Sequence, residues 1–375
     1  MTPPLLDLFL ELVSIPSPSG DERRVADRVG AYLTELGLEW DEDASGAAVG
    51  SNAGNIYCRL PRAGDNAAGG LPIFLCAHLD TVPPATSIEP VVDDGVVRNA
   101  NDTILGADNK AAVAVMLEAA RRITEELRPH AGIELLFTTK EEVGLVGAGA
   151  FDASRLEATL GYVYDHAGPI GEIVLGAPFG RALEIRFHGR AAHAGIAPEE
   201  GRSAIAAAAR AIADLRLGRL DPQTSANVGV ISGGVARNIV PEWCVVSAEA
   251  RSHDEETIVG LVQEMIEACS FAASVSDCTM EAEVREHYRG YRFRADDPVI
   301  QLAEIALRNA GATPTTMLCG GGADANVFNA AGVPCAVLAN GMAAIHSSEE
   351  HITVADLETM VNVTLELVEA ARHAA

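Results

Sequence analysis

The chain has 375 residues, of which 48% are hydrophobic and 21% are charged. This balance is typical of a globular protein and excludes disorder along most of the chain. Because a single hydrophobic core stops growing at roughly 250–300 residues, we expect two domains. Asp and Glu outnumber Lys and Arg by 53 to 27, and the formal net charge is -26. A negative field of this size repels phosphate groups, so we expect no nucleic-acid partner and no membrane-surface role.

The cysteines and the first residues favour the cytoplasm. The 7 cysteines are widely spaced and include no CxxC pair, which indicates neither a disulfide framework nor a zinc-thiolate site. The apolar stretch at 5–13 is interrupted by Asp7 and Glu11 and lacks a basic flank. It therefore predicts an amphipathic helix rather than a targeting signal. No apolar run reaches the ~18 residues of a membrane span, so we expect a soluble cytoplasmic protein.

Helical periodicity and short apolar runs alternate in the first half of the chain. Strands interleaved with helices of this length indicate an α/β layer with a parallel or mixed sheet. The predicted helices lie at 5–13, 22–36 and 111–127, and the predicted strands at 55–60, 73–77, 133–139 and 160–164.

The order of predicted helices and strands changes near residue 176. The stretch 177–289 has the order β-α-β-β-α-β of a ferredoxin-like unit, with strands predicted at 181–189, 226–231, 245–251 and 279–288 and helices at 202–217 and 255–269. Alternating helices and strands then resume, with helices predicted at 298–310, 323–330 and 355–373 and strands at 315–318 and 335–338. We therefore predict a larger domain of residues 1–176 and 290–375, interrupted by an inserted α+β domain of residues 177–289.

Polar side chains follow the first buried strands of the larger domain, where open α/β sheets bind their ligands. His78 and Asp80 come after the strand at 73–77, and alternate positions of an extended chain face the same way. A carboxylate beside an imidazole fixes the tautomer of a metal-binding histidine, although a solvated loop pair would give the same pattern. Asp108 precedes the helix at 111–127. It could be the N-cap of that helix, a carboxylate that bridges two cations, or both at once.

Three later strands end in the same way. Glu141 and Glu142 follow the strand at 133–139, and their mutual repulsion is costly unless cations compensate or both are solvated. Asp165 ends the strand at 160–164, and His346 follows the strand at 335–338. Two histidines and several carboxylates at shared strand ends form a nitrogen and oxygen donor set that suits two zinc ions or a related divalent pair. A glutamate left uncoordinated could act as a general base.

The ordered motifs at 77–82, 106–110 and 139–144, followed by Asp165 and His346, resemble those of the M20 metallopeptidases. The resemblance covers almost the whole chain and is closest to the peptidase T-like, tripeptide aminopeptidase branch. It implies a zinc-exopeptidase-like catalytic domain with a mixed sheet between helices, into which a lid and dimerisation domain is inserted. It also implies a di-zinc enzyme that cleaves small peptides, with cobalt or manganese as alternative metals.

The resemblance assigns a role to each of these residues. His78, Asp108 and Asp165 would hold one metal ion, and Asp108, Glu142 and His346 would hold the other. Glu141 would be the general base, and Asp80 would orient His78. An aspartate at position 165 goes with the aminopeptidases of the family. The resemblance also implies a cis peptide between Asp108 and Asn109.

The inserted domain carries three further candidates. His193 resembles a lid histidine that stabilises the oxyanion across a dimer interface, although an ordinary surface histidine is the alternative. Asn238 and Arg251 match substrate-binding positions of the family, and the fork of an arginine suits a peptide carboxylate. Outside this domain, the glycines at 320–322 could form a phosphate-type nest, but no Lys-Ser/Thr pair follows them, so a turn that contacts substrate is favoured. We expect a homodimer formed through the inserted domain.

Two alternatives to a peptidase of this kind remain open at the level of sequence. The same chemistry could act on an N-acyl amino acid or another small amide, because the difference lies in pocket shape. A catalytically silent zinc-bearing binding protein would keep the metal ligands but could have any residue at position 141, so Glu141 argues against it.

Overall fold

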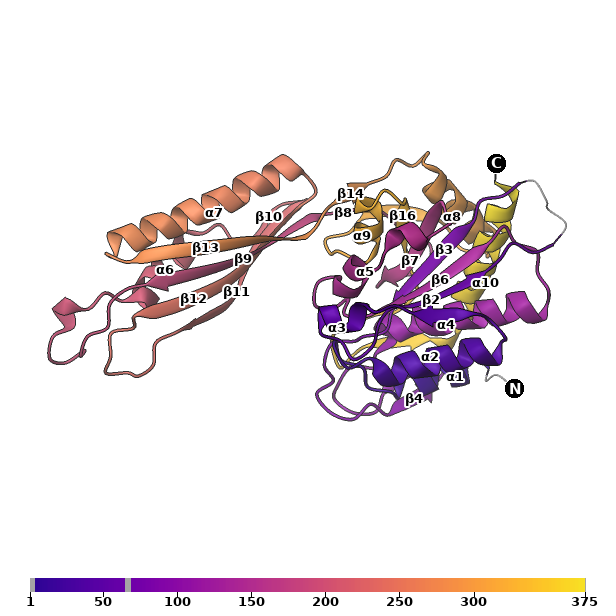
Figure 1. The fold of residues 1–375 in the computed structure, drawn as a ribbon, viewed down its shortest axis with the longest axis horizontal. Coiled ribbons are helices and arrows are strands. Elements are labelled where there is room, and N and C mark those ends of the chain that lie inside the picture. Colours follow the sequence, from indigo (N-terminus) through magenta and orange to yellow (C-terminus); the bar gives the residue numbers. More distant parts are fainter. Residues whose placement is uncertain (1–3, 65–68, 375) are drawn as a thin grey trace. The chain divides into compact units, whose positions relative to one another are not determined.

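The computed structural model describes residues 4–64 and 69–374, which belong to two compact units (Figure 1). The first comprises Met1–Leu175, Arg292–Cys319 and Ala323–Ala375, and the second comprises Gly176–Tyr291 and Gly320–Gly322. One is a mixed α/β unit and the other an antiparallel α+β unit, which confirms the predicted fold class.

A mixed sheet forms the centre of the first unit. Strand β3 (Ile73–His78) pairs in parallel with β6 (Ile133–Thr138) and with β7 (Leu160–His166), and β7 pairs in parallel with β16 (Cys335–Ala339). The carboxyl ends of these strands therefore lie at one edge of the sheet. The remaining strands flank these four. On the side of β6 the sheet continues with β2 (Ile56–Leu60) and β1 (Trp40–Glu42). On the side of β16 it continues with β8 (Glu172–Ala177), which is followed by β14 (Tyr291–Arg292) and also pairs with β15 (Thr315–Leu318).

Helices cover the sheet, and every residue of β3 and β6 is buried. Strands buried on both faces read as continuous apolar runs, which is why both were predictable. Helix α4 (Ala107–Glu125) packs on β3 and β7, and α1 (Leu5–Val13) and α10 (Val354–His373) pack against α4. The other helices of this unit are α2 (Arg23–Glu35), α3 (Ser45–Val49), α5 (Val146–Ala150), α8 (Pro298–Asn309) and α9 (Ala325–Ala330).

Several short strands of the first unit were not predicted. A separate small sheet has the order β17 (His351–Thr353), β5 (Val96–Asn99) and β4 (Pro90–Asp93). These strands have 3 or 4 residues each, which is too short for a period of two to stand out in the sequence.

The second unit is an antiparallel sheet in the order β10 (Gly218–Asp221), β11 (Thr224–Gly233), β12 (Trp243–Ser252), β9 (Phe179–His188) and β13 (Thr279–Tyr288). Its helices α6 (Ala204–Asp214) and α7 (Glu255–Val275) pack against the sheet (Figure 1). Buried and less buried residues alternate along β12, as expected for a sheet with one covered face. Strand β10 is an addition to the predicted ferredoxin-like order.

Helix α7 has the length and hydropathy of a membrane span, the one such helix in the described part of the chain, with a mean hydropathy of 1.4 over its most apolar window. Its Ile258, Leu261 and Met265 pack into the core of the second unit. A core helix of a soluble domain passes the same length and composition test, so this helix is weak evidence for a membrane segment.

Candidate metal centre

Strand ends and one helix start bring the predicted polar residues together. His78 is the last residue of β3, and Asp165 is the next-to-last residue of β7. Glu142 lies in the loop after β6, His346 lies in the loop after β16, and Asp108 lies in the first turn of α4. Two groups of donor atoms result, each with its atoms within 4.8 Å of one another, and they share Asp108.

His78, Asp108 and Asp165 form the first group. His78 Nε2 lies 3.3 Å from Asp108 Oδ1 and 3.5 Å from Asp165 Oδ1. Burial disfavours a protonated His78, but hydrogen bonds to the surrounding carboxylates outweigh it and raise the pKa of His78 well above its usual value. Burial raises the pKa of Asp165 to about 7. The carboxylates around His78 therefore favour a positive charge at this position.

Asp108, Glu142 and His346 form the second group. His346 Nε2 lies 3.2 Å from Asp108 Oδ2 and 3.1 Å from Glu142 Oε1. Hydrogen bonds to these two carboxylates raise the pKa of His346 to about 10. Burial opposes the ionisation of Asp108, but its hydrogen bonds to both histidines hold the pKa of Asp108 below its usual range. One oxygen of Asp108 thus faces each histidine, which is the arrangement of a bridging carboxylate.

Asp80 connects the end of β3 with the two glutamates. The main-chain oxygen of Asp80 lies 2.8 Å from His78 Nδ1 and its Oδ1 lies 3.4 Å from the same nitrogen. A proton on Nδ1 would leave the lone pair of Nε2 directed at the carboxylates of the first group. The Asp80 carboxylate also accepts hydrogen bonds from the backbone N–H groups of Glu141 and Glu142 and from Ser19 Oγ. Asp80 therefore fixes both the imidazole ring and the glutamate loop.

Glu141 belongs to neither group of donor atoms. Burial raises the pKa of Glu141 well above its usual value, and the neighbouring charge of Asp165 adds to the effect. Glu141 and Glu142 are adjacent in the chain, yet only Glu142 contacts His346. The two glutamates are therefore placed differently, as a ligand and a free base would be.

The interpretation of Asp108 as the N-cap of a helix is wrong. The start of α4 is kinked, because Asp108 and Asn109 have non-helical dihedral angles, and the carboxylate of Asp108 lies against His78 and His346 rather than against the helix that follows. The peptide bond between Asp108 and Asn109 is cis, as the resemblance implied. Backbone N–H groups at the start of α4 donate to Glu350 instead, while the Asp108 side chain faces the two histidines.

The three candidates of the second unit do not form one cluster. Exposed His193 forms an isolated β-bridge with Ile239, and the N–H of Ala194 donates to the carbonyl of Asn238 at 3.0 Å. Arg251 forms an ion pair with Glu249 at 3.0 Å and donates to the carbonyl of Gly320 at 3.4 Å. Where β12 pairs with β9, Arg251 of β12 is opposite Gly180 at one end, and Trp243 of β12 is opposite His188 at the other end. His193 and Asn238 therefore lie beyond one end of this sheet, and Arg251 lies at the other end.

Residues 74–370 match the family model described as peptidase family M20/M25/M40. This chain belongs to that family. A crystal structure of aminopeptidase PepT from Bacillus cereus ATCC 10987 is 40% identical, with 98% of both chains covered and a TM-score of 0.87. A tripeptidase from Staphylococcus aureus subsp. aureus Mu50 is 35% identical, with 98% of both chains covered and a TM-score of 0.91.

A curated relative, the uncharacterized protein YqjE of Bacillus subtilis (strain 168), is 36% identical over 367 residues, which cover 98% of each chain. The predicted membership of the M20 metallopeptidases and the likeness to their peptidase T-like branch are confirmed. The chain is therefore a hydrolase of the metallopeptidase class.

Asp324 is a buried carboxylate of this M20 peptidase that sequence reasoning missed. Asp324 is 1% exposed and accepts a hydrogen bond from Thr138 Oγ1 at 2.5 Å. Burial raises the pKa of Asp324 to about 6, and the hydrogen bond to Thr138 opposes this. Asp324 precedes the short helix α9 rather than following a strand, so the search for polar residues at strand ends could not find it.

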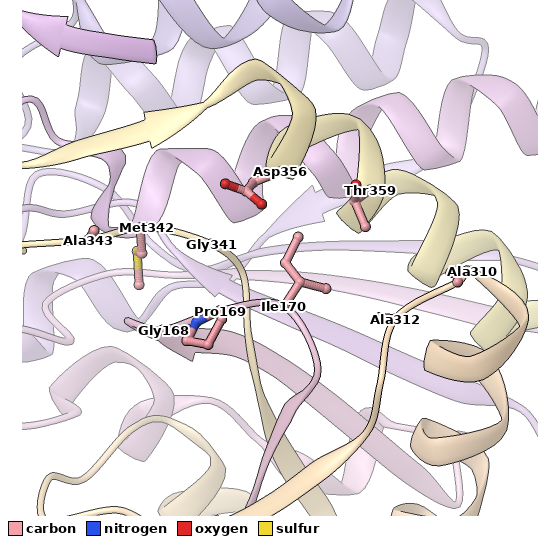
Figure 2. A pocket seen from close by; sticks show the side chains of 11 residues that line it. Gly168, Pro169, Ile170, Ala310, Ala312, Gly341, Met342, Ala343, Asp356 and Thr359 are labelled. Atoms are coloured by element: carbon pink, nitrogen blue, oxygen red, sulfur yellow. The ribbon is translucent and has the colours of Figure 1, made fainter. Parts of the chain in front are cut away.

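A separate pocket of the M20 peptidase holds none of these donor residues. Figure 2 shows Gly168, Pro169 and Ile170 on one side of it and Asp356 and Thr359 of α10 on another. Its one acidic side chain, Asp356, accepts a hydrogen bond from Thr353 Oγ1 at 2.6 Å. This pocket is therefore distinct from the candidate metal centre.

Proposed function

We propose that this M20 peptidase uses two divalent cations to remove the first residue of di- and tripeptides. His78, Asp108 and Asp165 would hold one cation, and Asp108, Glu142 and His346 would hold the other. The observation that supports this proposal is the shared carboxylate, because Asp108 directs one oxygen to each histidine.

The donor set fits zinc. Zinc binds imidazole nitrogen and carboxylate oxygen in sites of three or four protein ligands, and both groups consist of these atoms. Cobalt and manganese accept the same ligands and are the alternatives. The carboxylate oxygens of each group lie within 4.8 Å of one another, and buried carboxylates this close repel one another unless cations lie between them. This repulsion is a second reason to expect metal here.

Glu141 is the proposed general base. Bound cations would lower the pKa of a water molecule and polarise the scissile carbonyl. Glu141 would take the proton of this water and pass it to the leaving amine. Asp80 would keep His78 in the tautomer that presents Nε2, and its hydrogen bonds to the N–H groups of Glu141 and Glu142 would keep both glutamates in place.

The inserted domain, predicted as residues 177–289, is proposed to be a lid that forms a homodimer. Strand β9 has 10 residues and spans about 30 Å, with Arg251 near its start and the loop of His193 beyond its end. The chain enters and leaves this unit near Gly176 and Tyr291, at the end of the sheet that carries Arg251. Because Arg251 and His193 are separated by the length of β9, we expect them to act in two different active sites. Arg251 would bind the peptide carboxylate in its own subunit, and His193, with Asn238 beside it, would stabilise the oxyanion in the partner subunit.

The choice of an aminopeptidase is supported by Asp165 and by the relatives. The two solved relatives described above, at 40% and 35% identity, are called an aminopeptidase and a tripeptidase. The M20 fold also serves other amide hydrolases, since an amidase of the hydantoinase/carbamoylase family from Burkholderia multivorans has the same fold at 19% identity and a TM-score of 0.69. An N-acyl amino acid is therefore the second candidate substrate. We propose the cytoplasm as the location, because the 7 cysteines occur without any CxxC pair.

A substrate panel tests the proposal. Purified protein is loaded with Zn²⁺, Co²⁺ or Mn²⁺ and incubated with dipeptides, tripeptides, N-terminally acetylated peptides and N-acetyl amino acids. We expect the free amino-terminal residue to be released from di- and tripeptides, and we expect a chelator to abolish this release. Cleavage of N-acetyl amino acids alone would establish the deacylase alternative. Metal binding without cleavage of any amide would indicate a binding protein.

A further inference from the structure

Glu350 is a buried acid close to the candidate metal centre, with no role in the proposed reaction so far. Its side chain is 2% exposed. Glu350 Oε2 accepts hydrogen bonds from the N–H groups of Leu105 and Gly106, each at 2.8 Å. Glu350 Oε1 accepts one from the N–H of Asp108, also at 2.8 Å. All three donors belong to the segment that carries the shared carboxylate.

This carboxylate accepts hydrogen bonds from N–H groups just before α4 and within its kinked first turn. Asp108 and Asn109 have non-helical dihedral angles, so the buried N–H groups of this irregular segment need an acceptor from elsewhere in the chain. Because three N–H groups share two oxygens, a carboxylate satisfies them all, whereas an amide would set an NH₂ group against at least one donor.

Glu350 also connects this segment with the loop of His346. It lies four residues after His346 and immediately before β17, whose pairing with β5 holds the backbone in register. The chain can thus place Asp108 relative to His346 through one side chain, although the two are more than 200 residues apart in sequence. The buried ammonium of Lys110, which donates to the carbonyl of Ile15, attracts the charge of Glu350 electrostatically.

We propose that Glu350 is a positioning residue of the metal centre, and this inference rests on the proposed function. Its carboxylate holds the main chain of Asp108 so that one carboxylate oxygen faces each histidine. Without it, the start of α4 is free to shift, and both cation sites lose their common ligand at once. Residues that orient metal ligands in this way typically change metal affinity by roughly 10–100-fold when they are replaced.

The test compares Glu350→Gln with Glu349→Gln, an identical change at the adjacent and exposed position. Metal-free wild type and both variants are titrated with Co²⁺ in competition with a chromophoric chelator, and the visible absorption bands of bound Co²⁺ are recorded. Circular dichroism verifies that each metal-free protein is folded. We expect Glu350→Gln to bind Co²⁺ roughly 10–100-fold more weakly, with altered absorption bands. We expect Glu349→Gln to match the wild type in both measurements.

Wild-type affinity and unchanged bands in folded Glu350→Gln would overturn the inference and leave the proposed function intact. Failure of the wild type itself to bind Co²⁺ would overturn the proposed function, and the inference with it. If Glu350→Gln does not fold, Glu350→Asp is used in its place, because its shorter carboxylate keeps the charge but cannot reach all three N–H groups. Weaker binding of Co²⁺ by this variant supports the inference, and wild-type binding contradicts it.

Discussion

Glu141 and Glu142 have the same side chain at adjacent positions but different surroundings. Glu142 Oε1 lies 3.1 Å from His346 Nε2, whereas Glu141 belongs to neither group of donor atoms. The backbone N–H groups of both residues donate to the carboxylate of Asp80. The backbone of both residues is thus held by one carboxylate while their side chains have different neighbours, which is consistent with the roles of base and ligand proposed for them.

Replacement of Glu141 by Gln should stop turnover without loss of metal. Glutamine keeps the shape of the side chain but cannot accept the proton, and removal of a general base reduces rates by roughly 10²–10⁴-fold. Rates with a tripeptide, together with metal content by elemental analysis, check this prediction. His346→Ala is the contrast, because it should lower both metal content and rate. Loss of one metal equivalent in Glu141→Gln would instead identify Glu141 as a ligand.

Helix α4 is the element that connects the metal centre with the core. Its start carries Asp108, and the middle of the helix is buried among β3, β7 and α10. Near its other end, buried Glu118 accepts hydrogen bonds from Arg121 and Arg122, and Arg122 also contacts Glu358 of α10. The same helix therefore depends on two carboxylates for its position, Glu350 at its start and Glu118 further along.

Glu118→Gln should destabilise the protein in a pH-dependent way. Burial opposes the ionisation of Glu118, but its hydrogen bonds to Arg121 and Arg122 outweigh this and lower the pKa of Glu118 below its usual value. A lowered pKa in the folded state adds stability that is present at neutral pH and is lost as the pH falls through the folded-state pKa. We therefore expect a loss of about 1–3 kcal/mol at pH 7 and a smaller loss in acid.

Urea unfolding of the wild type and Glu118→Gln at several pH values measures this difference. Glu125→Gln is a suitable control, because Glu125 also contacts Arg121 but its side chain is half exposed, and exposed pairs contribute less than about 1 kcal/mol. An effect of Glu118→Gln that is equal at all pH values would show that lost packing, rather than lost charge, is responsible.

The candidate substrate-binding residues of the inserted unit lie at its two opposite ends. Arg251 lies at the end where the chain enters and leaves, and His193 lies beyond the other end. A homodimer with two-fold symmetry would let each subunit supply one of these residues to its partner's site. Exposed apolar side chains such as Val230, Ile231 and Trp243 of this unit are available for such an interface.

Mixed dimers of Glu141→Gln and His193→Ala test whether His193 acts in the partner subunit. Each variant alone should be inactive. In a mixed dimer, the His193→Ala subunit keeps its own Glu141 and receives His193 from its partner, so one of the two sites should be active. After complete exchange of equal amounts, about a quarter of the wild-type activity is expected for such a symmetric dimer. No recovery after verified exchange would show that His193 acts within its own subunit.

Much of the fold class and most residues of the candidate site could be predicted from the sequence. Buried parallel strands are continuous apolar runs, so the ends of β3, β6, β7 and β16 could be located, and with them the polar residues that follow. The ferredoxin-like order of the inserted unit was readable because its helices and strands have strong periodicity. Family motifs then supplied a role for each residue that these patterns had found.

Contacts between groups that are far apart in the chain could not be predicted from the sequence and are seen in the folded structure. Glu350 binds the backbone of Leu105, Gly106 and Asp108 at a separation of 242 to 245 residues, and no local pattern marks it. For the same reason the sequence suggested Asp108 as an N-cap, whereas the N–H groups of this segment donate to Glu350 from another loop. The placement of His193 and Arg251 at opposite ends of a sheet follows from the register of β9 and β12. Periodicity reports which face of its own element a residue occupies, whereas such partners depend on how distant elements pack.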